Sequence, residues 1–284
     1  MRLGVPLRGW GRVPGFRYPD PMRRDSCRLI NFERIEALPA GLMQGRGSAT
    51  VRALAGARWL LRRKRDGRWL GAVKGGRVLA LQPHALRAAL GPMAEGELLD
   101  RLDHAPAAGE ATLPLAPLRL LLVGLGIGAD YGEARGLPVV PEPASLAFAG
   151  FDRYRRPLWL TAAAARGWMR MRAAAAADGV ALEAISGYRS HAYQLGIFRR
   201  KLARGQRLED ILAVNAAPGY SEHHGGRALD IGTPGEPPAE ESFEATPEFD
   251  WLTAKAARFG FSMSYPRGNP HGIVYEPWHW CLDA

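Results

Sequence analysis

The sequence contains few cysteines. Of its 284 residues only Cys27 and Cys281 are cysteines, and they stand at opposite ends of the chain. Two cysteines cannot build a disulfide framework, and neither has the close spacing of a metal-binding pair. A single long-range disulfide remains an alternative, but two free thiols are the simpler prediction. Cysteine usage therefore does not decide the redox compartment.

The sequence also lacks a long apolar run. The most apolar stretch, LRLLLVGLGIGA at residues 118–129, is interrupted by Arg119 and falls short of a minimal membrane span of roughly seventeen residues. We predict a buried strand there. The basic N-terminus, MRLGVPLRGWGRVPGFRYPDPMRRD, has no continuous apolar core of the kind that a secretory signal needs. We therefore expect neither an export signal nor a membrane anchor, and a cytoplasmic location by default.

Charge is distributed unevenly along the chain. Residues 1–100 hold 19 Lys and Arg against 8 Asp and Glu, an excess of +11, and residues 101–284 hold 19 against 20, so the halves sum to the net +10. Such a basic third favours an anionic polymer or surface, and a solvated basic face is the alternative. The stretch WLLRRKRDGRW interleaves aromatic and basic residues, but no recognised nucleic-acid module is present. We expect no nucleic-acid partner.

The N-terminal part divides into two segments. Residues 1–45 are rich in Arg, Pro and Gly without periodicity and are predicted to be an irregular extension. Residues 46–117 are predicted to be a small basic β-rich region of unknown fold. Its Asp-Gly and Gly-Gly pairs at 66–67 and 75–76 indicate hairpin turns, a helix is expected over HALRAALGPM, and PAAGEATLPLAP resembles a linker.

The third segment, residues 118–284, has clearer local signals. Thr161 is positioned to cap a helix that Gly179 stops, and Thr246 to cap a helix with Pro247 in its first turn. Further helices are predicted over AYQLGIFRRKLARG and RLEDILAVN, and strands over VALEAISG, RALDI, FSMSY and GIVYEPWHW. This irregular order predicts an α+β fold, a small antiparallel sheet with flanking helices.

Two short motifs near the C-terminus contain metal-binding side chains. SEHHGGRALD places His223 and Asp230 seven residues apart across glycines, and YEPWHW contains Glu276 and His279. Two imidazoles and a carboxylate are enough for a zinc site with three protein ligands, and one glutamate remains to act as a base. His224 is an equally good ligand on chemistry alone.

Two further features bear on catalysis. In a regular strand, Glu276 and His279 would point to opposite faces, so both approach one metal only if Pro277 bends the backbone. Arg189, at the end of a predicted strand in SGYRS, can stabilise an oxyanion or bind a substrate carboxylate. The alternatives are a surface carboxylate for Glu276 and a surface salt bridge for Arg189. Gln194, one helical turn further on, can hydrogen-bond a substrate.

These motifs together resemble a known family. SGYRS, the pattern S-x-H-x-x-G-x-A-x-D and the pattern E-x-x-H look like those of the VanY-type zinc D-alanyl-D-alanine carboxypeptidases, in the fold group that includes lysostaphin-type peptidases and the hedgehog signalling domain. The resemblance covers about residues 150–284. It implies that one zinc ion is bound by His223 rather than His224, with Asp230 and His279 as the other ligands.

The resemblance also implies roles for the remaining residues. Glu276 would be the catalytic base and Arg189 would stabilise the transition state, while Ser190, Gln194 and Ser221 would line the substrate pocket. The expected reaction is removal of a C-terminal D-Ala from peptidoglycan stem peptides. The alternatives are an L,D-carboxypeptidase, a cross-link endopeptidase and a zinc-bearing binding module without catalysis. The family leads us to expect the cell envelope as the alternative location.

Overall fold

Two antiparallel sheets organise the protein, of which the computed structural model describes residues 27–43, 55–115 and 118–283. Within these residues the first sheet has seven strands in the order β5-β4-β3-β2-β1-β6-β7, and the second has four in the order β10-β11-β9-β8. The strands of the first sheet are β1 (Arg28–Asn31), β2 (Ile35–Pro39), β3 (Trp59–Arg63), β4 (Trp69–Lys74), β5 (Arg77–Ala80), β6 (Ser145–Phe151) and β7 (Pro157–Leu160). Those of the second are β8 (Glu183–Ser186), β9 (Ala228–Gly232), β10 (Phe261–Met263) and β11 (His279–Leu282). The predicted α+β class with an antiparallel sheet is confirmed.

Helices cover both sheets. The α-helices of the described residues are α2 (Pro83–Leu90), α3 (Glu95–Asp103), α4 (Leu118–Val123), α5 (Tyr131–Ala134), α6 (Ala162–Ala177), α7 (His191–Ala203), α8 (Leu208–Ala213) and α9 (Pro247–Lys255). Among the same residues, four short 3₁₀ helices are η2 (Ala40–Leu42), η3 (Glu222–Gly225), η4 (Glu241–Ala245) and η5 (Ala256–Phe259). In the described part of the chain, no helix is both long and apolar enough to cross a membrane.

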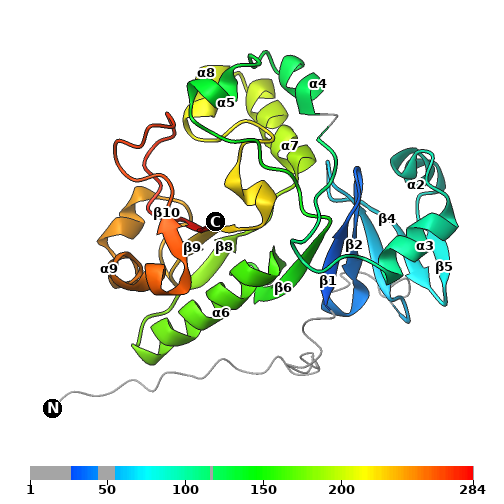
Figure 1. The fold of residues 1–284 in the computed structure, drawn as a ribbon, viewed down its shortest axis with the longest axis horizontal. Coiled ribbons are helices and arrows are strands. Elements are labelled where there is room, and N and C mark those ends of the chain that lie inside the picture. The colour runs from blue at the N-terminus through cyan, green and yellow to red at the C-terminus, as the bar shows by residue number, and fades with distance from the viewer. Residues whose placement is uncertain (1–26, 44–54, 116–117, 284) are drawn as a thin grey trace.

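Helix α6 packs between the two sheets (Figure 1). Its predicted N-cap is confirmed, because the Thr161 hydroxyl accepts a hydrogen bond from the Ala164 amide at 3.3 Å. Trp168 and Met171 on this helix are at most 1% exposed and share a hydrophobic core with Leu160 of β7 and Leu229 of β9. Burial of these large side chains, each contributing roughly 1.5–3 kcal/mol, fixes the sheet that holds the site.

The predicted β-meander is confirmed and belongs to the larger sheet. Strands β3, β4 and β5 pair antiparallel in sequence, joined by turns in which Gly67, Gly75 and Gly76 have positive φ angles. Strand β1 pairs with β2 on one side and with β6 on the other, where Leu29 lies opposite Leu146. Strands more than one hundred residues apart in the sequence are therefore neighbours.

Three predictions of local structure are wrong. The expected irregular extension through residue 45 contains β1, β2 and η2. The expected strand at residues 118–129 begins instead with helix α4, which buries Leu118 and Leu122 and exposes Leu120. The closing strand predicted over GIVYEPWHW starts only at His279, after a turn at Pro277.

Some expectations fall on residues that the structure does not describe. The predicted irregular segment over residues 1–26, the start of the β-rich region over residues 46–54, and the boundary near residue 117 lie outside the described residues. The domain boundaries at residues 45 and 117 therefore stay predictions. Cys27 and Cys281 are both free, as the simpler prediction had it.

Candidate metal centre and active site

The four-stranded sheet aligns two candidate metal ligands. Asp230 on β9 lies directly opposite His279 on β11 in the antiparallel register. His223 comes from η3, the short helix just before β9, and its Nε2 atom is 3.2 Å from Asp230 Oδ1. The three side chains are buried, and their potential ligand atoms lie within 4.8 Å of one another. The structure therefore brings together the three residues that the sequence predicted as ligands.

A glycine shapes the loop that presents His223. Gly226 ends η3 with φ 66°, in the left-handed region that favours glycine. A Cβ atom at this position would lie 2.5 Å from Leu146 Cδ2, so no side chain fits there. His224 points elsewhere: its Nδ1 donates to the Arg189 carbonyl at 2.6 Å, and its ring contacts His191. The geometry therefore distinguishes two histidines that ligand chemistry alone does not.

Hydrogen bonds fix which ring nitrogens face Asp230. His223 Nδ1 donates to the Gly187 carbonyl at 2.7 Å, and His279 Nε2 donates to Glu222 Oε2 at 2.8 Å. The remaining atoms, His223 Nε2 and His279 Nδ1, each lie 3.2 Å from Asp230 Oδ1. A carboxylate or carbonyl on the far nitrogen is the usual way in which proteins orient metal-binding histidines.

Glu222 was missed by the sequence analysis. It occupies a variable position of the S-x-H motif, and no periodicity or spacing singles it out. Burial alone would raise its pKa, but the hydrogen bond and charge of His279 lower it to about 2, so the residue is a carboxylate at neutral pH. The one available signal was a carboxylate adjacent in sequence to a candidate ligand histidine.

The electrostatics of the cluster favour a cation. Burial would raise the pKa of Asp230, but His223 and Arg189 hold it well below its usual range. Burial would lower the pKa of His279, but its hydrogen bonds to Asp230 and Glu222 raise it to about 10. The buried carboxylate of Asp230 and the partly exposed carboxylate of Glu222 therefore stabilise positive charge at this point of the sheet.

Glu276 lies beside the cluster because the backbone turns at Pro277. The His279 amide donates to the Glu276 carbonyl at 3.1 Å, which closes the turn before β11. Glu276 Oε2 then lies 3.7 Å from His279 Nδ1, so the bend that the sequence analysis required is present. Burial, together with the negative charge of Asp230, raises the pKa of Glu276 to about 7. A carboxylate with such a pKa can both accept and release a proton near neutral pH.

Arg189 reaches the same cluster from the end of β8. Its Nη2 donates to Asp230 Oδ2 at 2.6 Å and lies 2.7 Å from His223 Nε2, while its Nε donates to Ser186 Oγ at 3.1 Å. The side chain is 22% exposed, so it is not the surface salt bridge that was considered as an alternative.

The three predicted pocket residues are buried, and the side chains of Ser190 and Gln194 make hydrogen bonds to the backbone. Ser190 caps α7 by accepting a hydrogen bond from the Tyr193 amide at 3.1 Å. Gln194 donates to the Ala216 carbonyl at 3.0 Å, and its Oε1 atom has no hydrogen-bond partner among the described residues. Ser221 is buried immediately before η3. Their role in binding substrate stays a prediction.

With this geometry in place, comparison with known proteins identifies the family. A family model described as VanY, D-alanyl-D-alanine carboxypeptidase, matches residues 157–282. The bifunctional D-Ala-D-Ala dipeptidase and D-Ala-D-Ala carboxypeptidase VanXYC of Enterococcus gallinarum is 30% identical over 151 residues, which cover 49% of this chain and 73% of the relative. The chain belongs to the VanY family. The family predicted from the three motifs is confirmed.

Two further relatives align over shorter shares of their length. The Bacillus subtilis (strain 168) protein YodJ is 33% identical over 152 residues, 50% of this chain and 55% of YodJ. A D-alanyl-D-alanine carboxypeptidase of Enterococcus faecalis (strain ATCC 700802 / V583) is 33% identical over 117 residues, 38% of this chain and 42% of the relative. The chain spans about half the length of these two relatives.

Solved structures of similar proteins overlap with part of the chain. The LdcB LD-carboxypeptidase is 32% identical, with a TM-score of 0.41, over 44% of this chain and 59% of that one. VanYB in complex with D-alanine-D-alanine is 29% identical, with a TM-score of 0.38, over 44% of this chain and 72% of that one. Membership of the VanY family rests on the sequence relatives.

Proposed function

We propose that this protein is a zinc peptidase that removes the C-terminal D-Ala from peptidoglycan stem peptides. The observation that supports this most strongly is the buried cluster of His223, Asp230 and His279, with Glu276 and Arg189 directed at the same point. Family membership supports the choice of substrate, because relatives in the family are named for action on D-Ala-D-Ala.

The donor set fits zinc. Two imidazole nitrogens and one carboxylate oxygen are ligands that Zn²⁺ favours, and a catalytic site keeps one further position open. Each histidine has its other ring nitrogen hydrogen-bonded, His223 to Gly187 and His279 to Glu222, as is typical of zinc-binding imidazoles. His223, Asp230 and His279 would therefore hold one zinc ion.

The surrounding residues supply the rest of the mechanism. Zinc bound here would act as a Lewis acid that polarises the scissile carbonyl and makes water more acidic. Glu276 accepts the proton of the attacking water at its carboxylate and passes it to the departing amine of D-Ala. The guanidinium of Arg189 offsets the negative charge that develops on the tetrahedral intermediate. A zinc-bearing module without catalysis needs neither residue.

Two extensions of the proposal concern the rest of the chain. The excess of +11 in residues 1–100 supports binding of this third to anionic wall or surface polymers. Because the proposed substrate is part of the cell wall, the proposed place of action is the cell envelope.

Stem peptides test the proposal directly. The purified protein is incubated with a pentapeptide ending in D-Ala-D-Ala, a tetrapeptide ending in one D-Ala, and a cross-linked dimer, each with and without a chelator. We expect mass analysis to show loss of one D-Ala from the pentapeptide alone, abolished by the chelator and restored by zinc. Cleavage of only the tetrapeptide or only the dimer would replace the proposed specificity with an L,D-carboxypeptidase or an endopeptidase. Absence of all cleavage would favour the non-catalytic module.

A further inference from the structure

A buried carboxylate holds the residues on either side of Arg189. Glu142, in the segment before β6, accepts a hydrogen bond from the hydroxyl of Tyr188. Its other oxygen accepts the backbone N–H of His191 at 2.9 Å. Tyr188 precedes Arg189 directly and His191 follows it by two residues, so Glu142 fixes both ends of the turn that presents the guanidinium.

The same turn is connected to the metal-binding loop. The Arg189 amide donates to the His223 carbonyl at 3.1 Å, and the Arg189 carbonyl accepts a hydrogen bond from His224. The ring of His224 in turn packs edge-on against His191 at a centroid distance of 4.4 Å. The backbone of the turn is therefore held on two sides, by η3 and by Glu142.

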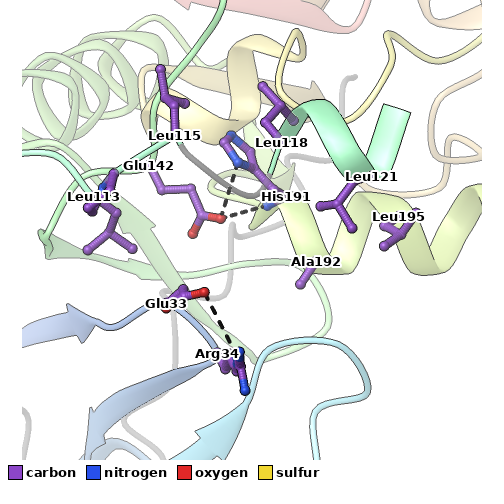
Figure 2. Close-up of a pocket in the computed structure, with 11 residues that line it drawn as sticks. Glu33, Arg34, Leu113, Leu115, Leu118, Leu121, Glu142, His191, Ala192 and Leu195 are labelled. Atoms are coloured by element: carbon purple, nitrogen blue, oxygen red, sulfur yellow. Dashed lines mark hydrogen bonds and ion pairs between the residues drawn. The ribbon is translucent and has the colours of Figure 1, made fainter. Parts of the chain in front are cut away.

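Glu142 keeps its charge because of a lysine from the N-terminal strands. Lys64 directly follows β3, its side chain is 0% exposed, and its Nζ lies 2.5 Å from Glu142 Oε2. Burial would raise the pKa of Glu142, but the charges of Lys64 and His191 lower it to about 2. Figure 2 shows the Glu142 carboxylate directed at His191 in the wall of a pocket between the β1–β2 turn and α7. A buried carboxylate deprived of its cation is expected to take up a proton or move toward water.

We propose that Lys64 is a positioning residue for Arg189, acting through Glu142 and the turn at residues 188–191. Both Lys64 and Glu142 lie outside residues 157–282, where the family model matches. Lys64 thus supports the active site from outside the residues that the family model matches. The inference rests on the proposed peptidase function, in which the guanidinium must meet the developing oxyanion.

Steady-state kinetics of zinc-loaded variants test the inference. We expect Lys64→Met to lower kcat roughly ten- to hundredfold, since a displacement of about 1 Å at a catalytic group has effects of that order, with zinc content unchanged. The neighbouring Arg63→Met is the matched control, because Arg63 pairs with Asp66 in the β3–β4 turn and is expected to leave kcat within about twofold. In an Arg189→Ala background, Lys64→Met should change kcat by less than about twofold. An equal loss of kcat in both backgrounds would overturn the inference, because it would indicate general destabilisation.

If Lys64→Met does not fold, a second variant and a second measurement still test the inference. Tyr188→Phe removes the hydroxyl that contacts Glu142 and Asn31, without leaving a lone buried charge. It should lower kcat only when Arg189 is present. Amide hydrogen exchange at Arg189 should accelerate about tenfold or more in Tyr188→Phe and in any folded Lys64→Met, and stay unchanged in Arg63→Met.

The exchange measurement also separates this inference from the proposed function. If the wild-type protein binds zinc but cleaves no stem peptide, the proposed function fails, and exchange at Arg189 then decides alone whether Lys64 holds the turn. Unchanged exchange in both Lys64→Met and Tyr188→Phe would overturn the inference whatever the peptide assay shows.

Discussion

Replacing Glu222 with glutamine should weaken zinc binding without removing a ligand. Glu222 Oε2 accepts the His279 Nε2–H at 2.8 Å, which orients the ring and makes its Nδ1 atom a stronger donor. Glutamine can accept the same hydrogen bond, so the ring orientation is retained, but the negative charge is lost. Glu222→Gln therefore measures how much the negative charge of Glu222 contributes to zinc affinity.

The size of the effect follows from the exposure of the carboxylate. Loss of such a hydrogen-bond partner typically costs 10–100-fold in metal affinity, or about 1.4–2.7 kcal/mol. The Glu222 side chain is 31% exposed, so water screens part of its charge, and the hydrogen bond itself survives the substitution. We therefore expect the lower end of this range, about tenfold in the zinc dissociation constant.

A competition titration against a fluorescent zinc chelator at pH 7 and fixed salt measures the difference. Glu209→Gln is the matched control, since this carboxylate lies on α8 with a side chain 72% exposed, and its removal should leave the constant unchanged. Melting of the metal-free proteins checks that both variants are folded. A dissociation constant for Glu222→Gln within twofold of the wild-type value would refute the role of Glu222.

Three further predictions follow from the same geometry. His223→Ala should lose zinc at concentrations that saturate the wild-type protein, while His224→Ala should retain it, and metal analysis after dialysis distinguishes them. The pKa of Glu142 is lowered from 4.5 to about 2. The ionised carboxylate therefore stabilises the folded protein fully above pH 4.5, and this contribution, on the order of 3 kcal/mol, is lost as the pH falls toward 2. The free energy of unfolding in urea, measured between pH 6 and pH 3, should therefore depend less on pH for Glu142→Gln than for the wild-type protein. An equal pH dependence in the two proteins would count against this role of Glu142. Residues 1–26 hold six arginines and two aspartates, so their deletion removes a net +4 and should weaken binding to polyglutamate at low salt, with the difference disappearing at high salt. Unchanged binding after the deletion would show that residues other than 1–26 bind the polymer.

Local signals predicted the helix ends well because the physics of a cap is local. Thr161 and Thr246 each accept a hydrogen bond from a backbone amide three residues later, a contact that depends only on neighbouring residues. The apolar run at residue 118 was misread because nearly every position is hydrophobic, which conceals the helical spacing of the buried Leu118 and Leu122. The strand β1 could not be predicted, since its four residues depend on pairing with β6.

The candidate site was predictable where residue type dictates chemistry. Histidine and aspartate in a spaced motif are recognisable as ligands, and Pro277 predicted the bend that directs Glu276 to the cluster. The positions of Glu222 and Lys64 follow from tertiary contacts, with His279 on β11 and with Glu142 before β6. The sequence near Lys64 gives no signal of its contact, and the one signal for Glu222 is that it directly precedes His223.

The central claim is that Glu276 acts as a base beside a zinc ion held by His223, Asp230 and His279. The most direct test compares zinc-loaded Glu276→Gln with the wild-type protein on a stem pentapeptide, with zinc content and D-Ala release measured on the same samples. Glutamine has nearly the shape of glutamate but cannot accept the proton, and a positioned general base is typically worth about 10²–10⁴-fold in rate. We predict full zinc content and a loss of turnover of that size. Full zinc content together with wild-type release of D-Ala would contradict the account.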